Sequence, residues 1–170
     1  ISSINGVRRT SEDQLFDECL ERVNFFIGHG TTTIEAKSGY GLTLEDELKS
    51  LRVIQRLNES SKLDIIPTFM GAHAFPPEFK GNPSAYIDLI CDRMIPAVAE
   101  EKLAEYCDVF CEKGYFSVGD SLKILETAKK YGFTPRLHAD EFVDSGAAEL
   151  AAEVGAISAD HLMAVSDKGI

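Results

Sequence analysis

The feature that most constrains this chain is a repeated unit, in which a helical stretch is followed by a short apolar strand ending in polar residues. The pattern predicts five strands, each separated from the next by helix. They cover residues 31–36, 63–70, 106–112, 134–139 and 156–160. Because strands and helices alternate strictly, the sheet should be parallel.

The helices are predicted from apolar residues at helical spacing and from residues that favour helix ends. A capping box at Ser11 opens the first, and Gly28 ends it. A second helix is capped by Thr43 with Asp46, and a third covers residues 84–103 and is interrupted near Pro96. A fourth begins at Ser117 and Asp120 and ends at Gly132. The last covers residues 145–154 and ends at Gly155.

Polar side chains at the strand ends favour a barrel over an open, doubly wound sheet. These residues are Tyr40, His73, Glu112, His138 with Glu141, and His161. In a barrel all carboxyl ends meet at one mouth, whereas an open sheet builds its site at one switch point. Five units are too few to close eight strands. The predicted fold is therefore α/β, an incomplete parallel (β/α) barrel of TIM type, with about strands two to six in one domain over residues 1–170.

Composition excludes several classes of partner. A net charge of -11 argues against binding to nucleic acid or to an anionic membrane surface. No apolar run approaches the ~20 residues of a membrane span, and residues 1–6 lack the pattern of a signal peptide. We therefore expect a cytoplasmic protein. The missing initial methionine leads us to expect further residues upstream.

Cysteine usage agrees with a reducing compartment. The four cysteines, Cys19, Cys91, Cys107 and Cys111, are scattered through apolar helical and strand patterns. We expect buried free thiols. Cys107 and Cys111 lack a second Cys/His pair at ligand spacing, which argues against a zinc finger.

The strongest chemical signal is His138 followed three residues later by Glu141. Neutral imidazole is a common metal ligand, and a carboxylate just beyond the strand can exchange protons with a substrate over the mouth. His161 ends the next strand, and neighbouring strands lie ~4.8 Å apart, so both histidines can share one ion or one water. The alternative is that each histidine only hydrogen-bonds a loop.

Tyr40 and His73 are less specific. A phenol and an imidazole at neighbouring strand ends can bind a planar polar substrate, although a loop tyrosine usually packs on a neighbour. The glycines on either side of Tyr40 should bring backbone close to whatever the site holds. His29 precedes its strand, so we expect it at the opposite rim and assign it no role.

Five motifs together resemble the imidazolonepropionase family of the amidohydrolase superfamily. They are Glu35-Ala36-Lys37-Ser38-Gly39-Tyr40-Gly41-Leu42, Met70-Gly71-Ala72-His73-Ala74, Asp108-Val109-Phe110-Cys111-Glu112, Leu137-His138-Ala139-Asp140-Glu141-Phe142 and Ser158-Ala159-Asp160-His161-Leu162. The resemblance covers essentially the whole chain, as the central part of the barrel domain. His-x-x-Glu alone would indicate only the superfamily.

The resemblance implies a metal-dependent hydrolase of histidine degradation, which opens the ring of 4-imidazolone-5-propanoate to give N-formimidoyl-L-glutamate. It implies one divalent metal ion, Zn or Fe, with His138 as a ligand. His161 would hold and help to deprotonate the attacking water, and Glu141 would shuttle protons. Tyr40 and His73 would contact the small-molecule substrate. The family also suggests a homodimer.

One departure from the family pattern is large. The chain contains neither the His-x-His pair of the first strand nor the aspartate of the eighth. It therefore supplies one of the four expected ligands, and we expect this segment alone to be inactive.

Two other functions compete with this one. One is that of another cyclic amidohydrolase or a deaminase, and substrate profiling of the intact protein would distinguish it from imidazolonepropionase activity. The other is that of a non-catalytic barrel or binding module, in which the histidines are ordinary polar residues. Metal analysis of the intact protein would identify it by the absence of stoichiometric metal.

Overall fold

The fold is a curled parallel sheet covered by helices. The computed structural model describes residues 2–170. Its strands are β1 (Thr33–Lys37), β2 (Asp64–Ala72), β3 (Tyr106–Cys111), β4 (Thr134–Ala139) and β5 (Ser158–His161). All neighbouring pairs are parallel, and the spatial order is β1-β2-β3-β4-β5. The predicted five parallel strands are confirmed.

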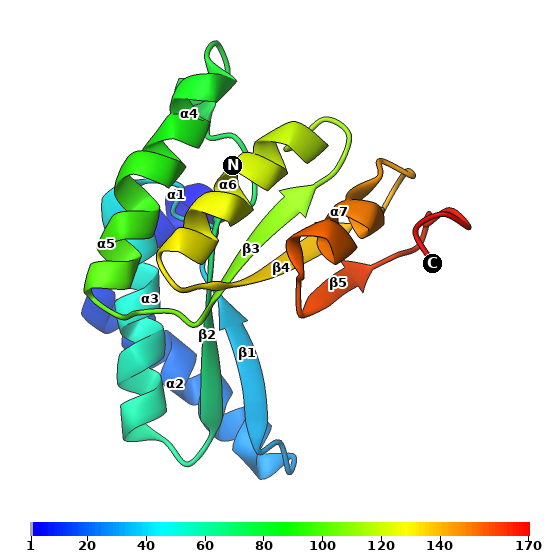
Figure 1. Cartoon of the computed structure of the whole chain (residues 1–170). Coiled ribbons are helices and arrows are strands. Elements are labelled where there is room, and N and C mark those ends of the chain that lie inside the picture. Colours follow the sequence, from blue (N-terminus) through cyan, green and yellow to red (C-terminus); the bar gives the residue numbers. More distant parts are fainter. Residues whose placement is uncertain (1) are drawn as a thin grey trace.

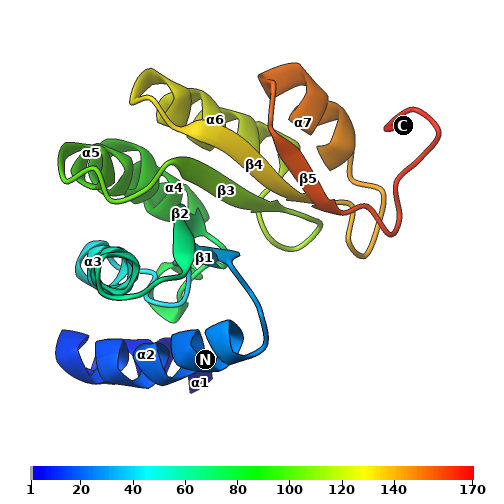
Figure 2. The ribbon, with the colours of Figure 1, turned by 90° about the horizontal axis from the view of Figure 1, so that it is seen from below.

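Strand order separates the two architectures that the sequence allowed. A doubly wound sheet reverses its strand order at a switch point, whereas a barrel adds each strand beside the previous one. The sheet follows chain order throughout. Figures 1 and 2 show it curling, with the helices along its outer side and the strands innermost. The incomplete barrel is therefore confirmed.

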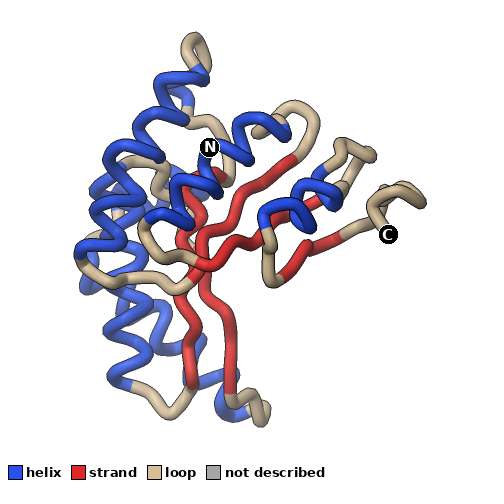
Figure 3. The backbone as a smooth tube through the Cα atoms, in the orientation of Figure 1, coloured by secondary structure: helices blue, strands red, loops and turns tan. Residues whose placement is uncertain are grey.

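Within residues 2–170, two helices precede β1 and the others connect successive strands; Figure 3 shows them distributed along the sheet. They are α1 (Ser2–Arg9), α2 (Glu12–Gly28), α3 (Leu44–Ser60), η1 (Pro77–Phe79), α4 (Pro83–Leu89), η2 (Ile90–Met94), α5 (Ile95–Glu100), α6 (Val118–Lys130) and α7 (Ala147–Val154).

The predicted helix starts agree with the observed caps. The hydroxyl of Ser11 accepts a hydrogen bond from the N–H of Gln14, and Oε1 of Gln14 accepts one from the N–H of Ser11. Thr43 caps α3 through the N–H of Asp46. Each cap satisfies a backbone donor that has no partner within the helix.

Two parts of the helical layer differ from the prediction. α1 was not predicted, because its eight residues carry only two large apolar side chains, Ile4 and Val7; none of its residues is buried. The stretch predicted over residues 84–103 is three pieces, with the π-helical turn η2 between α4 and α5. Pro96 lies in the first turn of α5, where its missing N–H matters least. The interruption is confirmed, and it begins before the proline.

The core lies between the sheet and the helices. Tyr86 of α4, Phe69 of β2 and Phe116 of the β3–α6 connection are among its largest fully buried side chains. Cys91, Cys107 and Cys111 are buried free thiols, as predicted, whereas Cys19 is only partly buried. Among residues 2–170 no helix combines the length and hydrophobicity needed to cross a membrane.

Candidate active site at the carboxyl ends of the strands

Three of the predicted site residues converge where β4 and β5 end. The backbone register sets Ala139 opposite His161, so His138 and His161 lie on neighbouring strands. Their ring centroids are 5.1 Å apart. Nε2 of His161 lies 3.5 Å from Oε2 of Glu141, which comes from the loop after β4. Two imidazoles and one carboxylate therefore share one corner of the mouth.

The other two predicted residues form a pair at the ends of β1 and β2. The rings of Tyr40 and His73 meet edge to face with centroids 4.8 Å apart. Phe110, at the end of β3, lies between this pair and the histidine corner, with centroids 6.2 Å from His73 and 5.9 Å from His138. All five predicted residues thus lie along one rim. His29 ends α2, before β1 begins, and lies at the opposite rim as expected.

A polar network that the sequence did not reveal fills the concave face beneath this rim. Nζ of Lys37 lies 2.6 Å from Oδ2 of Asp108 and 3.1 Å from Oδ2 of Asp160. The other oxygen of Asp108 lies 3.1 Å from Nδ1 of His138. Side chains of β1, β3, β4 and β5 are thereby joined by one lysine and one buried aspartate.

The charges of this network are mutually stabilising. Burial opposes ionisation of Asp108, but His138 and Lys37 outweigh it and lower the pKa of Asp108 below its ordinary value. Burial also disfavours a charged Lys37, yet Asp108 and Asp160 raise the pKa of its ammonium. The ion pair is therefore formed at neutral pH. In the neutral form of His138, Nδ1 carries the proton, because an ionised carboxylate only accepts, and Nε2 has a free lone pair.

A second layer lies deeper in the half-barrel. Oε2 of Glu35 accepts a hydrogen bond from Nη1 of Arg136 at 2.8 Å, and Oε1 accepts one from the hydroxyl of Thr68 at 2.5 Å. The guanidinium of Arg136 also lies over the ring of Tyr106, 4.4 Å from its centroid. The inward positions are thus charged and paired, which suits a floor beneath a polar site.

Two carboxylates hold the loop that carries Glu141. Oε2 of Glu112, at the end of β3, accepts hydrogen bonds from the N–H groups of Phe142 and Val143 at 2.8 and 3.4 Å. Asp140 accepts from the N–H groups of Ser145, Ala147 and Ala148, where α7 begins.

The two anchors explain why this loop has a fixed path. Burial opposes ionisation of Asp140, but the hydrogen bonds from the first turn of α7 outweigh it and lower its pKa. Glu112, predicted only as a strand-end polar residue, is 2% exposed and reaches the loop from the neighbouring strand. Glu141 is therefore fixed on both sides, by Asp140 before it and by Glu112 after it.

The loop after β1 has an anchor that sequence analysis missed. Glu47, in the first turns of α3, is 0% exposed and accepts hydrogen bonds from the backbone N–H groups of Gly39, Gly41 and Leu42. Burial raises the pKa of Glu47, although these hydrogen bonds oppose the shift. One signal could have identified it. Glu47 lies three residues after Leu44 and four before Leu51, on the apolar side of the predicted helix.

The glycines on either side of Tyr40 lie against other parts of the chain. A Cβ on Gly39 would come within 2.7 Å of the carbonyl oxygen of Met70, and one on Gly41 within 2.5 Å of Cβ of Asp46. These contacts leave the prediction that the glycines bring backbone close to whatever the site holds as a prediction. They allow the loop to pack against β2 and α3.

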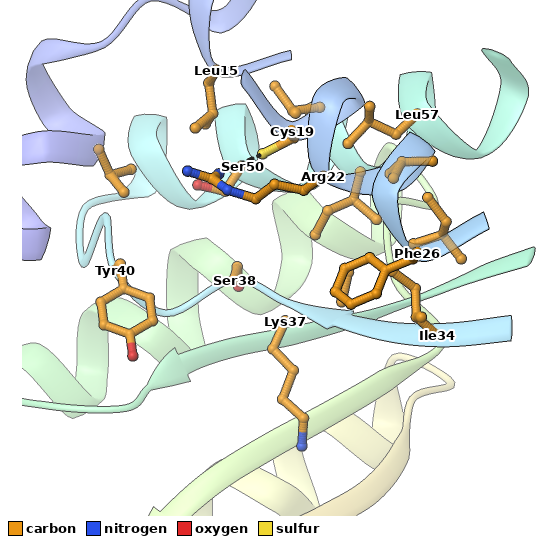
Figure 4. A pocket seen from close by; sticks show the side chains of 16 residues that line it. Leu15, Cys19, Arg22, Phe26, Ile34, Lys37, Ser38, Tyr40, Ser50 and Leu57 are labelled. Carbon is orange, nitrogen blue, oxygen red and sulfur yellow. Dashed lines mark hydrogen bonds between the residues drawn. The ribbon is translucent and has the colours of Figure 1, made fainter. Parts of the chain in front are cut away.

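A separate apolar cavity of about 310 Å³ lies between α2, α3 and β1. Figure 4 shows Leu15, Phe26 and Leu57 around it, with the amino group of Lys37 pointing away from these helices. The inner face of β1 thus contributes Lys37 to the polar network, while its outer face lines the cavity. The cavity holds none of the histidine corner.

Comparison with known proteins adds an independent observation. No family model matches the chain. Curated relatives match all 170 residues, with 53% identity to imidazolonepropionase of Thermoanaerobacter pseudethanolicus and 54% to those of Shouchella clausii and Clostridium tetani. The chain spans 38 to 41% of the length of these relatives. Over its whole length it is similar to a part of these proteins, as its five motifs indicated.

Proposed function

We propose that this chain is a segment of an imidazolonepropionase, a barrel enzyme that hydrolyses 4-imidazolone-5-propanoate to N-formimidoyl-L-glutamate in histidine degradation. The observation that carries the proposal is the corner formed by His138, Glu141 and His161. Identity of 53% over all 170 residues supports it. Because the match covers only part of each relative, the active unit in this proposal is a longer polypeptide.

His138 fits the role of one ligand to a divalent metal ion. A metal-binding histidine commonly donates its second ring N–H to a carboxylate, and His138 meets Asp108 in this way. Asp108, His138 and Asp160 also lie close enough to suggest a three-ligand site, with ligand atoms within 4.8 Å of one another. Lys37 already pairs with both aspartates, which makes them poor ligands for a further cation. We therefore assign His138 alone as a ligand from this segment.

A bound Zn or Fe ion would lower the pKa of water to ~7 and polarise the ring carbonyl. The protein side chains supply binding and proton transfer. Tyr40 and His73 would hold the planar ring from the β1–β2 side. His161 would orient the attacking water and help to remove its proton.

Glu141 would complete proton transfer. Its carboxylate lies beside His161 and projects over the mouth, so it can accept a proton during attack and return one to the leaving ring nitrogen. The leaving nitrogen needs that proton because an amide anion is a poor leaving group.

The test is turnover by the longer polypeptide. We expect it to consume 4-imidazolone-5-propanoate, to form N-formimidoyl-L-glutamate detectable by mass spectrometry, and to lose activity on chelation. Preferential turnover of other cyclic amides, or deamination, would instead support the related hydrolase. A protein without stoichiometric metal would support a binding module. The proposal also includes a cytoplasmic homodimer, which cell fractionation and light scattering would test.

A further inference from the structure

Glu47 is a fully buried carboxylate for which the proposed reaction has no direct use. Oε1 accepts hydrogen bonds from the N–H groups of Leu42 and Gly41 at 2.8 and 3.0 Å. Oε2 accepts one from the N–H of Gly39 at 2.9 Å, and the same N–H lies 3.2 Å from Oε1. Burying a carboxylate is costly unless hydrogen bonds replace its water. Here three amides of one short loop replace it.

The same loop is confined from its other sides. Gly39 has φ +108 and lies against Met70, so a side chain there would be both strained and obstructed. Leu42 also has a positive φ of 57 and is 1% exposed. Nε of Arg8, from α1, donates to the carbonyl of Gly41 at 2.7 Å. The loop is thus gathered around Glu47.

The loop carries Tyr40 and contacts His73, the two residues proposed to bind the substrate. Tyr40 stands between the two glycines with 48% of its surface exposed. The carbonyl of Gly39 lies 2.8 Å from Nδ1 of His73. Since a carbonyl only accepts, Nδ1 is the protonated nitrogen and Nε2 of neutral His73 can accept a hydrogen bond. The orientation of both rings therefore depends on the backbone at residues 39–41.

We propose that Glu47 is a positioning residue for the substrate half of the mouth. It fixes the backbone that carries Tyr40 and that selects the tautomer of His73, although it touches neither ring. The inference rests on the proposed function and extends it. A preorganised loop binds a small planar substrate without the entropic cost of ordering residues 39–42 on binding.

A carboxylate suits this position better than an amide. Glutamine has one oxygen, so a Glu47→Gln side chain that keeps Oε1 in place turns its NH₂ group toward the N–H of Gly39. Two donors would then face each other. Gly39, whose carbonyl holds His73, would then lose its shorter hydrogen bond to Glu47 and keep only the longer contact to Oε1.

The experiment compares Glu47→Gln with Glu45→Gln in the longer polypeptide. The control makes the same chemical change in the same helical turn, at an exposed position. Hydrogen exchange by mass spectrometry reports on residues 38–42, and steady-state kinetics report on catalysis. We expect faster exchange in that segment and KM about tenfold higher, with kcat changed less than about threefold, in Glu47→Gln only.

Unchanged exchange over residues 38–42 in a folded Glu47→Gln protein would overturn the inference, as would faster exchange with an unchanged KM. If Glu47→Gln does not fold, Glu47→Asp retains the charge but is one methylene shorter. It should give the same pattern with a smaller rise in KM, and normal exchange and KM would again refute the role. A wild-type protein without turnover would defeat the proposed function, while the exchange comparison would still decide whether Glu47 orders the loop.

Discussion

The two halves of the mouth are held in different ways. On the β1–β2 side, Tyr40 and His73 depend on a loop whose anchor, Glu47, is entirely buried. On the β4–β5 side, Glu112 and Asp140 hold the loop that carries Glu141, and the side chains of Glu141 and His161 are 25% and 38% exposed.

Backbone strain is also distributed unequally. Asp140, His161 and Leu162 have φ values of 48, 77 and 56, whereas Leu42 is the comparable residue in the β1–β2 half. Non-glycine residues seldom adopt positive φ, and such strain tends to occur at functional sites. The comparison suggests a division of labour, with binding in the half whose loop has a buried anchor and chemistry in the half with the more strained backbone.

The largest effect should come from His138→Ala in the longer polypeptide. Removal of a strong ligand leaves the metal with a deficient shell, so most of it should be lost on dialysis, as measured by elemental analysis. His73→Ala is the matched change in the other half and should leave the metal content normal. Equal metal loss from both variants would abolish the distinction between the halves.

The next effect should come from Glu141→Gln. The amide keeps the shape and hydrogen-bonding capacity of the side chain but cannot carry a proton, so the chemical step should slow by about 10² to 10⁴. Metal content and thermal stability should remain normal. Near-normal turnover in a folded, metal-loaded variant would rule out proton transfer by Glu141.

The anchors should differ in their dependence on pH. Asp140 has a lowered pKa, so its stabilising effect is present above its ordinary value of 3.8 and is lost as pH falls through its folded-state pKa. Asp140→Asn should therefore lower the free energy of unfolding by about 1–3 kcal/mol at neutral pH, and by less in acid.

Glu47→Gln should show the opposite trend. The raised pKa of Glu47 means that its contribution is fully present below its ordinary value of 4.5 and declines as pH rises through the folded-state pKa. Urea unfolding of both variants and wild type across the acid range would check this pair. Parallel pH dependence in the two variants would show that the anchors are equivalent.

The smallest effect should come from Tyr40→Phe. Only a hydroxyl is removed, and it belongs to the half without the proposed ligand. We expect KM to rise by about fivefold to tenfold, the equivalent of one hydrogen bond, with unchanged metal content. Unchanged kinetics would show that the hydroxyl of Tyr40 does not bind the substrate and that the side chain only packs against its neighbours.

Sequence alone predicted the parts of this molecule that depend on local pattern. Strand β4 was predicted at its observed bounds, because its apolar residues are followed directly by polar ones. The rim of histidines also followed, since the ends of parallel strands must meet. Lys37 and Asp108 were missed as partners because their contact joins residues 71 positions apart, which no local pattern records.

Glu47 was missed for a different reason. It follows Glu45 and Asp46 after a helix cap, where acidic residues are common and usually solvated. Which of three consecutive acidic residues is buried depends on how α3 is rotated against β1 and β2. That rotation is a tertiary property, and helical spacing gives only a hint of it.

The strand order has a consequence for how the chain folds. Each strand pairs with the one made just before it, so a growing chain can add one unit at a time to an existing template. The contact between Lys37 and Asp160 is different, since it spans 123 positions and joins the first strand to the fifth. It can form only after every intervening unit has docked. The polar network should therefore form last. A delay or error in the folding of any single unit would leave Lys37 and Asp108 without their contact to Asp160.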